Sequence, residues 1–297
     1  MTDRQSIKAA GPLIAIVGQT ASGKSDLAMR AAIELGSEII AADSWTVRKK
    51  LDIGTAKPTL DIQRKVPHHL LDIVEPCADF TAVEFQRQAQ RAIHDIQARS
   101  NVPLIVGGTG LYIDSVLYDY TFSPKSTDSE RQRYNAMSRE ELLMEAEAKM
   151  LDASSIDTRN KRRIIRLLET GGHQPSRQLF LRPNTLVVGL SIGKQQLHQR
   201  IEQRVDTMLE AGLEQEVANL AQAYGWDCEG LKGIGYREWR DYFVGNQSLE
   251  QTRFRIIQAT KQLAKRQHTW FKRSEDIDWC ANVDEALQKM YAFLQKS

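Results

Sequence analysis

The sequence predicts an α/β protein in which a parallel sheet is flanked by helices and interrupted by an all-helical insertion. Short, wholly apolar runs alternate with helical patterns in both halves of the chain, as doubly buried strands and their connecting helices do. Between residues 120 and 183 the apolar runs vanish and charged helical segments replace them. We therefore predict a sheet domain with C-terminal helices at 1–120 and 184–297, and a helical insertion at 121–183.

The predicted elements of the sheet domain follow a regular order along the chain. Residues 13–17 are wholly apolar and predict a buried strand, and the helical spacing of leucine and alanine predicts a helix over 24–35. Two further strands are predicted at 38–42 and 103–106, with an amphipathic helix over 85–98 between them. This alternation is typical of a doubly wound sheet.

The second half of the chain begins with the insertion. Residues 139–151 and 162–169, rich in glutamate, arginine and lysine, predict two of its helices. Residues 185–190 restore an apolar strand pattern, so the sheet resumes there. Residues 197–220 and 249–271 are strongly helical and complete the predicted domain.

Composition and charge limit the class of protein. The chain has 297 residues, of which 41% are hydrophobic and 26% charged, which excludes a disordered, collagen-like or coiled-coil protein. Its 40 basic and 38 acidic residues leave a net charge of +2, so any surface that binds nucleic acid must be local.

The cysteines and the apolar runs bear on the cellular compartment. Cys77, Cys228 and Cys280 lie far apart without a CxxC pair, so we expect reduced thiols and neither a disulfide nor a zinc site. No run of 18 apolar residues occurs, and the first eleven residues contain no apolar leader segment. We therefore expect a cytoplasmic protein that does not enter a membrane.

A phosphate-binding loop follows the first predicted strand and opens the first predicted helix. Its residues match the pattern G-x-x-x-x-G-K-[ST] in full and indicate a P-loop NTPase-like fold. Backbone N–H groups would surround phosphate oxygens, the lysine would add a positive charge, and the serine could bind Mg²⁺. The loop consists of Gly18, Gln19, Thr20, Ala21, Ser22, Gly23, Lys24 and Ser25.

Two polar residues follow other strands of the predicted sheet. Asp43 comes after the second strand, where open α/β sheets bind ligands, and could be a general base, an indirect Mg²⁺ partner or a turn residue. Thr109 lies among glycines after the third strand, where its hydroxyl could donate to a ligand oxygen.

Two basic clusters make RNA a plausible partner. The first lies in the insertion and is otherwise explained as a solvated helix face. The second is interleaved with His268, Trp270 and Phe271, whose rings are either core anchors or stacking platforms for bases. The clusters are Arg159, Lys161, Arg162, Arg163 and Arg166, and Lys261, Lys265, Arg266, Lys272 and Arg273.

The chain closely resembles the bacterial tRNA dimethylallyltransferases in motifs that span nearly its whole length. Two of the motifs, LDIGTAKP and AKRQHTWF, are specific to that family, whereas the phosphate loop is shared by many nucleotide enzymes. The matching stretches are GQTASGKSDLA, LDIGTAKP, PHHLLDIVEP, PLIVGGTGLYI, LHQRIEQRVDTMLEAGLEQEV, GIGYREW and ATKQLAKRQHTWF.

The resemblance implies prenyl transfer from dimethylallyl diphosphate to the exocyclic amino nitrogen of the adenosine at position 37. This base lies 3′ to the anticodon in tRNAs that read codons beginning with U. It also implies Mg²⁺, a phosphate loop that holds diphosphate, a helical insertion that binds the anticodon stem-loop, and a target base flipped into a channel. A monomer is expected.

The resemblance also implies residue roles. Asp43 would be the catalytic base, Thr109 and Arg204 would assist catalysis, residues 18–25 would bind diphosphate, and Ser25 would hold the metal. The residues that would bind tRNA are Asp43, Ser44, Trp45, Thr46, Thr109, Arg131, Lys161, Arg162, Arg163, Ile164, Ile165, Lys232, Gly233, Ile234, Gly235, Tyr236 and Arg237.

The chain departs from the family pattern at two positions, and two other functions would each explain part of its sequence. Family members usually carry Gln and Tyr where this chain has Thr46 and Arg48, so contacts to the flipped base are expected to differ. A small-molecule enzyme on the same fold, either an adenylate isopentenyltransferase or a nucleoside kinase, would explain the phosphate loop but not the basic insertion. A non-catalytic RNA-binding protein would explain the insertion but not the loop.

Overall fold

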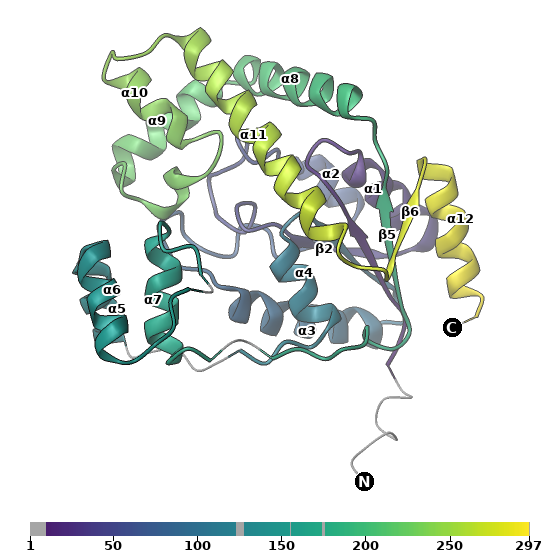
Figure 1. The fold of residues 1–297 in the computed structure, drawn as a ribbon. Coiled ribbons are helices and arrows are strands. Elements are labelled where there is room, and N and C mark those ends of the chain that lie inside the picture. Colours follow the sequence, from purple (N-terminus) through teal and green to yellow (C-terminus); the bar gives the residue numbers. More distant parts are fainter. Residues whose placement is uncertain (1–9, 123–127, 155, 174–175, 297) are drawn as a thin grey trace. The chain divides into compact units, whose positions relative to one another are not determined.

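The computed structural model describes residues 10–122, 128–154, 156–173 and 176–296 (Figure 1). The chain forms two compact units, one made of Met1–Leu117 with Phe180–Ser297 and the other of Tyr118–Leu179. The division predicted from sequence placed the boundaries after residues 120 and 183. Assignment of the second unit to tRNA binding stays a prediction.

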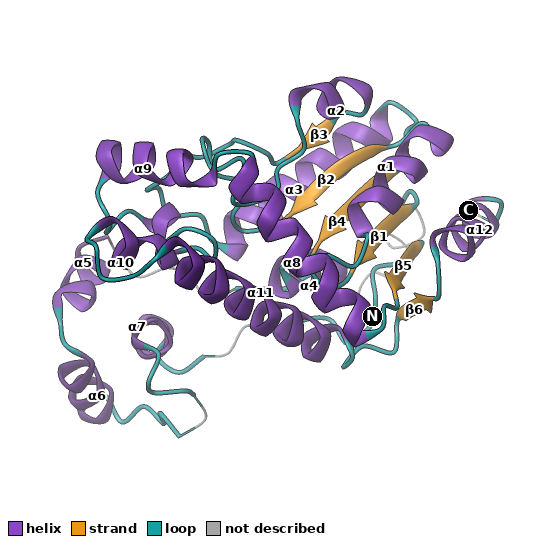
Figure 2. Ribbon diagram, turned by 90° about the horizontal axis from the view of Figure 1, so that it is seen from above, coloured by secondary structure: helices purple, strands orange, loops and turns teal. Residues whose placement is uncertain are grey.

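The first unit contains a six-stranded sheet in the order β3-β2-β4-β1-β5-β6, with all neighbouring strands parallel (Figure 2). The sequence predicted four of these strands and missed the two at the edges. β3 has only two residues, and β6 alternates polar with apolar residues because it is half exposed. The strands are β1 Leu13–Val17, β2 Glu38–Ala42, β3 His68–His69, β4 Pro103–Gly107, β5 Thr185–Leu190 and β6 Ile277–Cys280.

The central strand β1 explains why the predicted strands are wholly apolar. All five of its residues are fully buried. Ile16 lies between Val106 of β4 and Val188 of β5, so the strand has a neighbour on each side. Helix α1 (Lys24–Leu35) packs on it through Leu27 and Ala31. Burial on all sides leaves no position for a polar side chain.

The carboxyl ends of three central strands are level with one another. Val17 of β1 pairs with Gly107 of β4, which in turn pairs with Ala42 of β2. A Cβ atom at Gly107 would lie 2.1 Å from the carbonyl oxygen of Ala42, so the strands can approach only because this residue is glycine. The segments that carry the phosphate loop, Asp43 and Thr109 therefore leave the sheet side by side.

Helices cover both faces of the sheet and build a second core beside it. Helices α8, α9 and α11 share an apolar cluster that includes Ile201, Val217 and Ile256, and α8 and α11 lie side by side (Figure 1). Among the described residues, none of the helices has both the length and the apolar character needed to cross a membrane. The helices are α1, α2 Leu60–Lys65, α3 Ala82–Ala98, α4 Gly110–Leu117, α8 Lys194–Glu210, α9 Leu213–Tyr224, α10 Arg240–Phe243, α11 Leu249–Phe271 and α12 Val283–Leu294, with 3₁₀ helices η2 Glu229–Lys232 and η3 Arg237–Trp239.

The second unit is helical in its described part. It contains α5 Asp128–Ala136, α6 Arg139–Ala148 and α7 Lys161–Thr170, which pack through a small apolar core. Ser138 and Glu141 form a reciprocal capping box at the start of α6, and the Asn160 side chain caps α7. Both predicted helices of the insertion are present, one with its start unchanged and the other ends moved by one to three residues.

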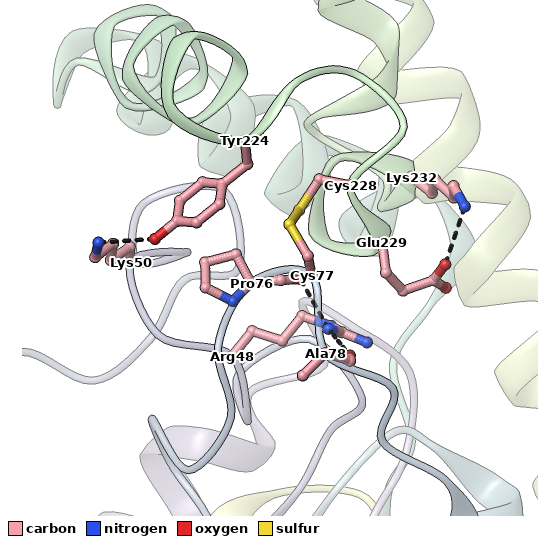
Figure 3. Close-up of a disulfide and its surroundings, with 9 residues drawn as sticks. All are labelled: Arg48, Lys50, Pro76, Cys77, Ala78, Tyr224, Cys228, Glu229 and Lys232. Carbon is pink, nitrogen blue, oxygen red and sulfur yellow. Dashed lines mark hydrogen bonds and ion pairs between the residues drawn. A yellow bond between two sulfur atoms is a disulfide. The ribbon is translucent and has the colours of Figure 1, made fainter. Parts of the chain in front are cut away.

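The expectation that all three cysteines are reduced is wrong in the structure. Cys77 and Cys228 form a disulfide with Cα atoms 4.7 Å apart (Figure 3). Cys280 is the free, buried thiol. The paired residues are 151 positions apart in sequence, so their spacing gives no sign of the bond. Folding brings the segment after β3 against η2, where Gly230 donates its N–H to the Pro76 carbonyl at 2.9 Å.

Reduction of this disulfide should destabilise the protein. Opening a loop of this length increases the conformational entropy of the unfolded chain, and native disulfides typically contribute about 2–4 kcal/mol. We expect dithiothreitol to lower the free energy of unfolding by that amount in urea titrations, with no further effect on a Cys77→Ser, Cys228→Ser double variant. Three reactive thiols in the denatured, unreduced protein would contradict the bond.

Candidate active site

The phosphate loop forms a turn whose backbone is bent at three positions. Gly18 has φ 145°, Ala21 φ 62° and Gly23 φ 97°, all on the positive side. A left-handed residue between right-handed ones turns successive N–H groups toward the inside of a loop, which is the geometry of an anion-binding nest. Helix α1 begins directly after Gly23, so its N-terminus adds a favourable dipole.

Two cations lie beside this loop. Lys24 donates from Nζ to the Gln19 carbonyl at 3.0 Å, and Arg204 of α8 donates from Nη1 to the Thr20 hydroxyl at 3.1 Å. Desolvation, reinforced by the charge of Arg204, lowers the pKa of Lys24 to about 8, although the charge of Asp43 acts in the opposite direction. Burial also lowers the pKa of Arg204. Two poorly solvated positive charges are a site for an anion.

Asp43 and Thr109 lie at the ends of β2 and β4 and contact the same turn. Asp43 accepts through Oδ1 from the N–H of Trp45 at 2.8 Å and of Thr46 at 3.3 Å. The Thr109 hydroxyl accepts from the Ser44 N–H at 3.2 Å, which leaves its own hydrogen for donation. Asp43 is therefore held in a turn, as one sequence alternative required, and also faces the cavity described next.

A cavity of about 380 Å³ joins these groups. Its volume lies within the range of small-molecule sites, roughly 300–1,000 Å³. The phosphate loop, the turn after β2, the turn after β4, α8, the segment after η2 and α11 all contribute to its wall. Its lining includes Thr20, Asp43, Ser44, Trp45, Gly54, Thr55, Thr109, Arg204, Lys232, Ile234, Gly235, Arg237, Arg266 and Gln267.

Sequence reasoning gave no role to several residues that build this cavity. Gln267 of α11 accepts through Oε1 from the Thr20 N–H at 2.7 Å and donates through Nε2 to the Gly108 carbonyl at 3.1 Å. It thereby ties the phosphate loop to the turn that carries Thr109. Gly54 and Thr55 also line the cavity. These residues belong to the motifs AKRQHTWF and LDIGTAKP, which were the available signal.

Some residues expected to bind tRNA do not present their side chains. The Tyr236 ring is fully buried, and its hydroxyl donates to Glu216 at 2.7 Å. Gly233 is buried against Trp45, and Thr46 is 8% exposed. Any contact of Tyr236 with RNA would have to come from its backbone.

The first basic cluster lies on α7 of the second unit, apart from Arg159, which precedes the helix. Ile164 and Ile165 are core residues of that unit, and Arg131 forms an ion pair with Glu169 at 3.2 Å. Arg162 and Arg163 are exposed on the opposite face of the helix. Within this unit the charged face is therefore open to a ligand, while the two isoleucines support it from below.

A divalent metal at the phosphate loop would depend on its ligand. The described residues contain no group of three or more His, Cys, Asp or Glu side chains that could hold a metal. Ser25 is exposed in the first turn of α1 and offers one hydroxyl oxygen. Mg²⁺ is commonly held by one or two protein oxygens together with phosphate oxygens and water, so the residues present fit that ion.

The fold and the site define a P-loop α/β protein with a carboxylate beside its phosphate loop. The far wall of the same cavity leaves room for a second ligand. Comparison with known sequences narrows this class. The chain belongs to the IPP transferase family, whose model matches residues 46–274.

Relatives in sequence and structure agree with this assignment. The tRNA dimethylallyltransferase of Geobacillus thermodenitrificans is 42% identical over 92% of this chain and 91% of its own. The enzyme of the same name from Bacillus subtilis is 38% identical over 95% of both chains. The crystal structure of the tRNA delta(2)-isopentenylpyrophosphate transferase from Staphylococcus epidermidis has a TM-score of 0.72 at 31% identity, covering 96% of this chain and 99% of its own.

The pKa of Lys24 predicts a pH dependence of anion binding. An anion favours the protonated ammonium, so affinity should be full below about pH 8 and fall by up to about tenfold per pH unit above it. We expect calorimetric titration with pyrophosphate to show this decline between pH 7 and 9. Lys24→Met should bind pyrophosphate more weakly. It should also lose the part of the decline that comes from Lys24, and keep the part that comes from ionisation of pyrophosphate, which is common to both proteins. Equal slopes in the two proteins would contradict it.

Proposed function

We propose that the protein transfers a dimethylallyl group from dimethylallyl diphosphate to the exocyclic amino nitrogen of the adenosine 3′ to the anticodon of tRNA. One observation carries the proposal: Asp43 and Thr109 line the same cavity as Thr20 and Arg204. A proton acceptor and a site for diphosphate would thus share one space. The names of the relatives supply the prenyl donor and the tRNA acceptor.

The acceptor nitrogen needs a base because its lone pair is delocalised into the adenine ring. In the proposed step this nitrogen forms a bond to the allylic carbon, and the bond from that carbon to the diphosphate oxygen breaks. The electron pair of the broken bond leaves with diphosphate, and the Asp43 carboxylate takes the proton from nitrogen. The Thr109 hydroxyl accepts from the Ser44 N–H, so its own hydrogen would be donated to an oxygen of the diphosphate or of the Asp43 carboxylate.

Departure of diphosphate is the larger electrostatic problem. An allylic carbon tolerates positive charge, so stabilising the negative charge on the leaving oxygen lowers the barrier most. The positive-φ turn of the loop, the ammonium of Lys24 and the guanidinium of Arg204 would supply that stabilisation. The Ser25 hydroxyl would hold Mg²⁺, which supplies further positive charge to the diphosphate.

The RNA side of the proposal rests on the exposed basic face of α7. Arg162 and Arg163 would contact phosphates of the anticodon stem-loop, and the target adenine would leave its stack to reach the cavity. The other tRNA-binding residues, the monomeric state and a cytoplasmic location are part of the same proposal. The location follows from the acceptor, because tRNA is a cytoplasmic molecule in bacteria.

The acceptor can be identified directly. Incubation with labelled dimethylallyl diphosphate, Mg²⁺ and either unmodified tRNA or AMP should label tRNA and leave AMP unlabelled. Labelling of AMP alone would favour an adenylate isopentenyltransferase, and transfer of phosphate from ATP to a nucleoside would favour a kinase. Tight tRNA binding without any transfer would favour a non-catalytic RNA-binding protein.

A variant of Asp43 tests the role of this residue as the base in the same assay. Asp43→Ala should slow turnover at least about 100-fold, the usual cost of losing a general base. Its fold should be retained, because the side chain lies at the end of β2 rather than in the core. Near-normal turnover in a folded Asp43→Ala protein would remove the base assignment while leaving the acceptor assignment intact.

Phosphate contacts of α7 should appear in the salt dependence of tRNA binding. Each phosphate contact contributes about 1 to the slope of log K against log salt concentration. Arg163→Ala should therefore reduce that slope by about 1, and Arg162→Ala by a similar amount. Arg139→Ala is the matched control because Arg139 is exposed in the same unit and pairs with Glu140 at 2.7 Å. Slopes unchanged in both test variants would contradict binding through this face.

A further inference from the structure

The carboxylate of Glu216 on α9 collects four hydrogen bonds from two separate segments. Oε2 accepts from the N–H groups of Asp52 at 3.0 Å and Ile53 at 2.8 Å. Oε1 accepts from the Gly54 N–H at 3.0 Å and from the Tyr236 hydroxyl at 2.7 Å. One side chain thus joins the turn that begins LDIGTAKP to the middle of GIGYREW.

The segments joined in this way form one wall of the cavity. Gly54 and Thr55 line it from the first segment, and Ile234, Gly235 and Arg237 line it from the second. The segments touch closely, because a Cβ atom at Gly54 would lie 2.5 Å from the Tyr236 ring. Neither segment is a strand or an α-helix at these positions, so contacts such as those of Glu216 must fix their conformation.

The four donors match a carboxylate, which accepts at both oxygens and has no hydrogen of its own to donate. All of them are neutral, and each hydrogen bond is strengthened by the carboxylate charge. Burial, followed by the charge of Glu216, strongly raises the pKa of Tyr236, so its hydroxyl keeps its proton and remains a donor. A glutamine in place of Glu216 would turn an amide N–H toward at least one of these N–H or O–H groups.

Other residues hold the part of the cavity where the prenyl donor would bind. Thr20 is fixed by Gln267 and Arg204, and Thr109 is fixed by the backbone of Ala42 and Ser44. None of these groups hydrogen-bonds to Glu216. A change at Glu216 therefore acts on one wall and leaves the contacts of the phosphate loop in place.

We propose that Glu216 is a positioning residue for the acceptor nucleoside. It contacts no substrate but holds the wall formed by Gly54, Thr55 and residues 234–237 in the shape that receives the flipped base. This inference rests on the proposed function for its choice of ligand, while the restraint on the two segments is independent of it. The expected signature is a selective loss on the tRNA side.

The kinetic test compares Glu216→Gln and Tyr236→Phe with a matched control. Glu214, two residues earlier on α9, accepts from the Tyr242 hydroxyl at 2.9 Å and does not line the cavity, so Glu214→Gln removes the same charge elsewhere. We expect kcat/KM for tRNA to fall at least about tenfold in Glu216→Gln and about threefold in Tyr236→Phe. The KM for dimethylallyl diphosphate should change by less than about twofold, and Glu214→Gln should behave as the parent protein.

A second measurement keeps the inference testable without catalysis. Hydrogen exchange should quicken at residues 51–56 and 233–237 in Glu216→Gln, and should not quicken there in Glu214→Gln. Equal losses for both substrates, or exchange that rises throughout the chain, would show a merely structural role and overturn the proposal. If the parent protein transferred no prenyl group to tRNA, the proposed function would fail, while the exchange result would still decide whether Glu216 holds the wall.

Discussion

The level ends of β1, β4 and β2 are the constraint on which the rest of this protein depends. Because Val17, Gly107 and Ala42 share one register row, the three turns that follow them leave the sheet together. The phosphate loop, Thr109 and Asp43 are thereby brought to one cavity, although they lie far apart in the sequence. Hydrogen bonding within the sheet is rigid, so chemistry placed on these turns inherits a fixed geometry.

The electrostatics of the cavity follow from that convergence. Lys24 and Arg204 are both poorly solvated. Without a ligand the site therefore has an excess of positive charge, which the negative charge of Asp43 offsets only in part. A bound diphosphate would offset this positive charge. The same arrangement would keep the Asp43 carboxylate close to cations in the free protein and beside a polyanion when substrate is bound.

Local and distant features differed in how far the sequence could predict them. The four central strands and the phosphate loop were found because each is encoded by adjacent residues, either as an apolar run or as a spaced motif. The edge strands β3 and β6 have no such pattern, since a half-exposed strand needs few apolar residues. Gln267, Glu216 and the disulfide were missed for another reason. Each joins segments that lie far apart in the chain, and the spacing of residues along the sequence does not predict such contacts.

The segment from Cys228 to Glu238 shows why these distant contacts matter. It contains only short 3₁₀ turns, so its backbone cannot hold itself in place. The disulfide to Cys77 and the hydrogen bond from Gly230 to Pro76 fix its beginning, and Glu216 fixes its middle through Tyr236. Lys232 and Arg237 are exposed between and beyond these restraints. Lys232 pairs with Glu229 at 3.2 Å and Arg237 with Glu238 at 2.9 Å, and both cations stand on a backbone that is anchored from both sides. If RNA binds here as proposed, the wall beneath them would keep its shape.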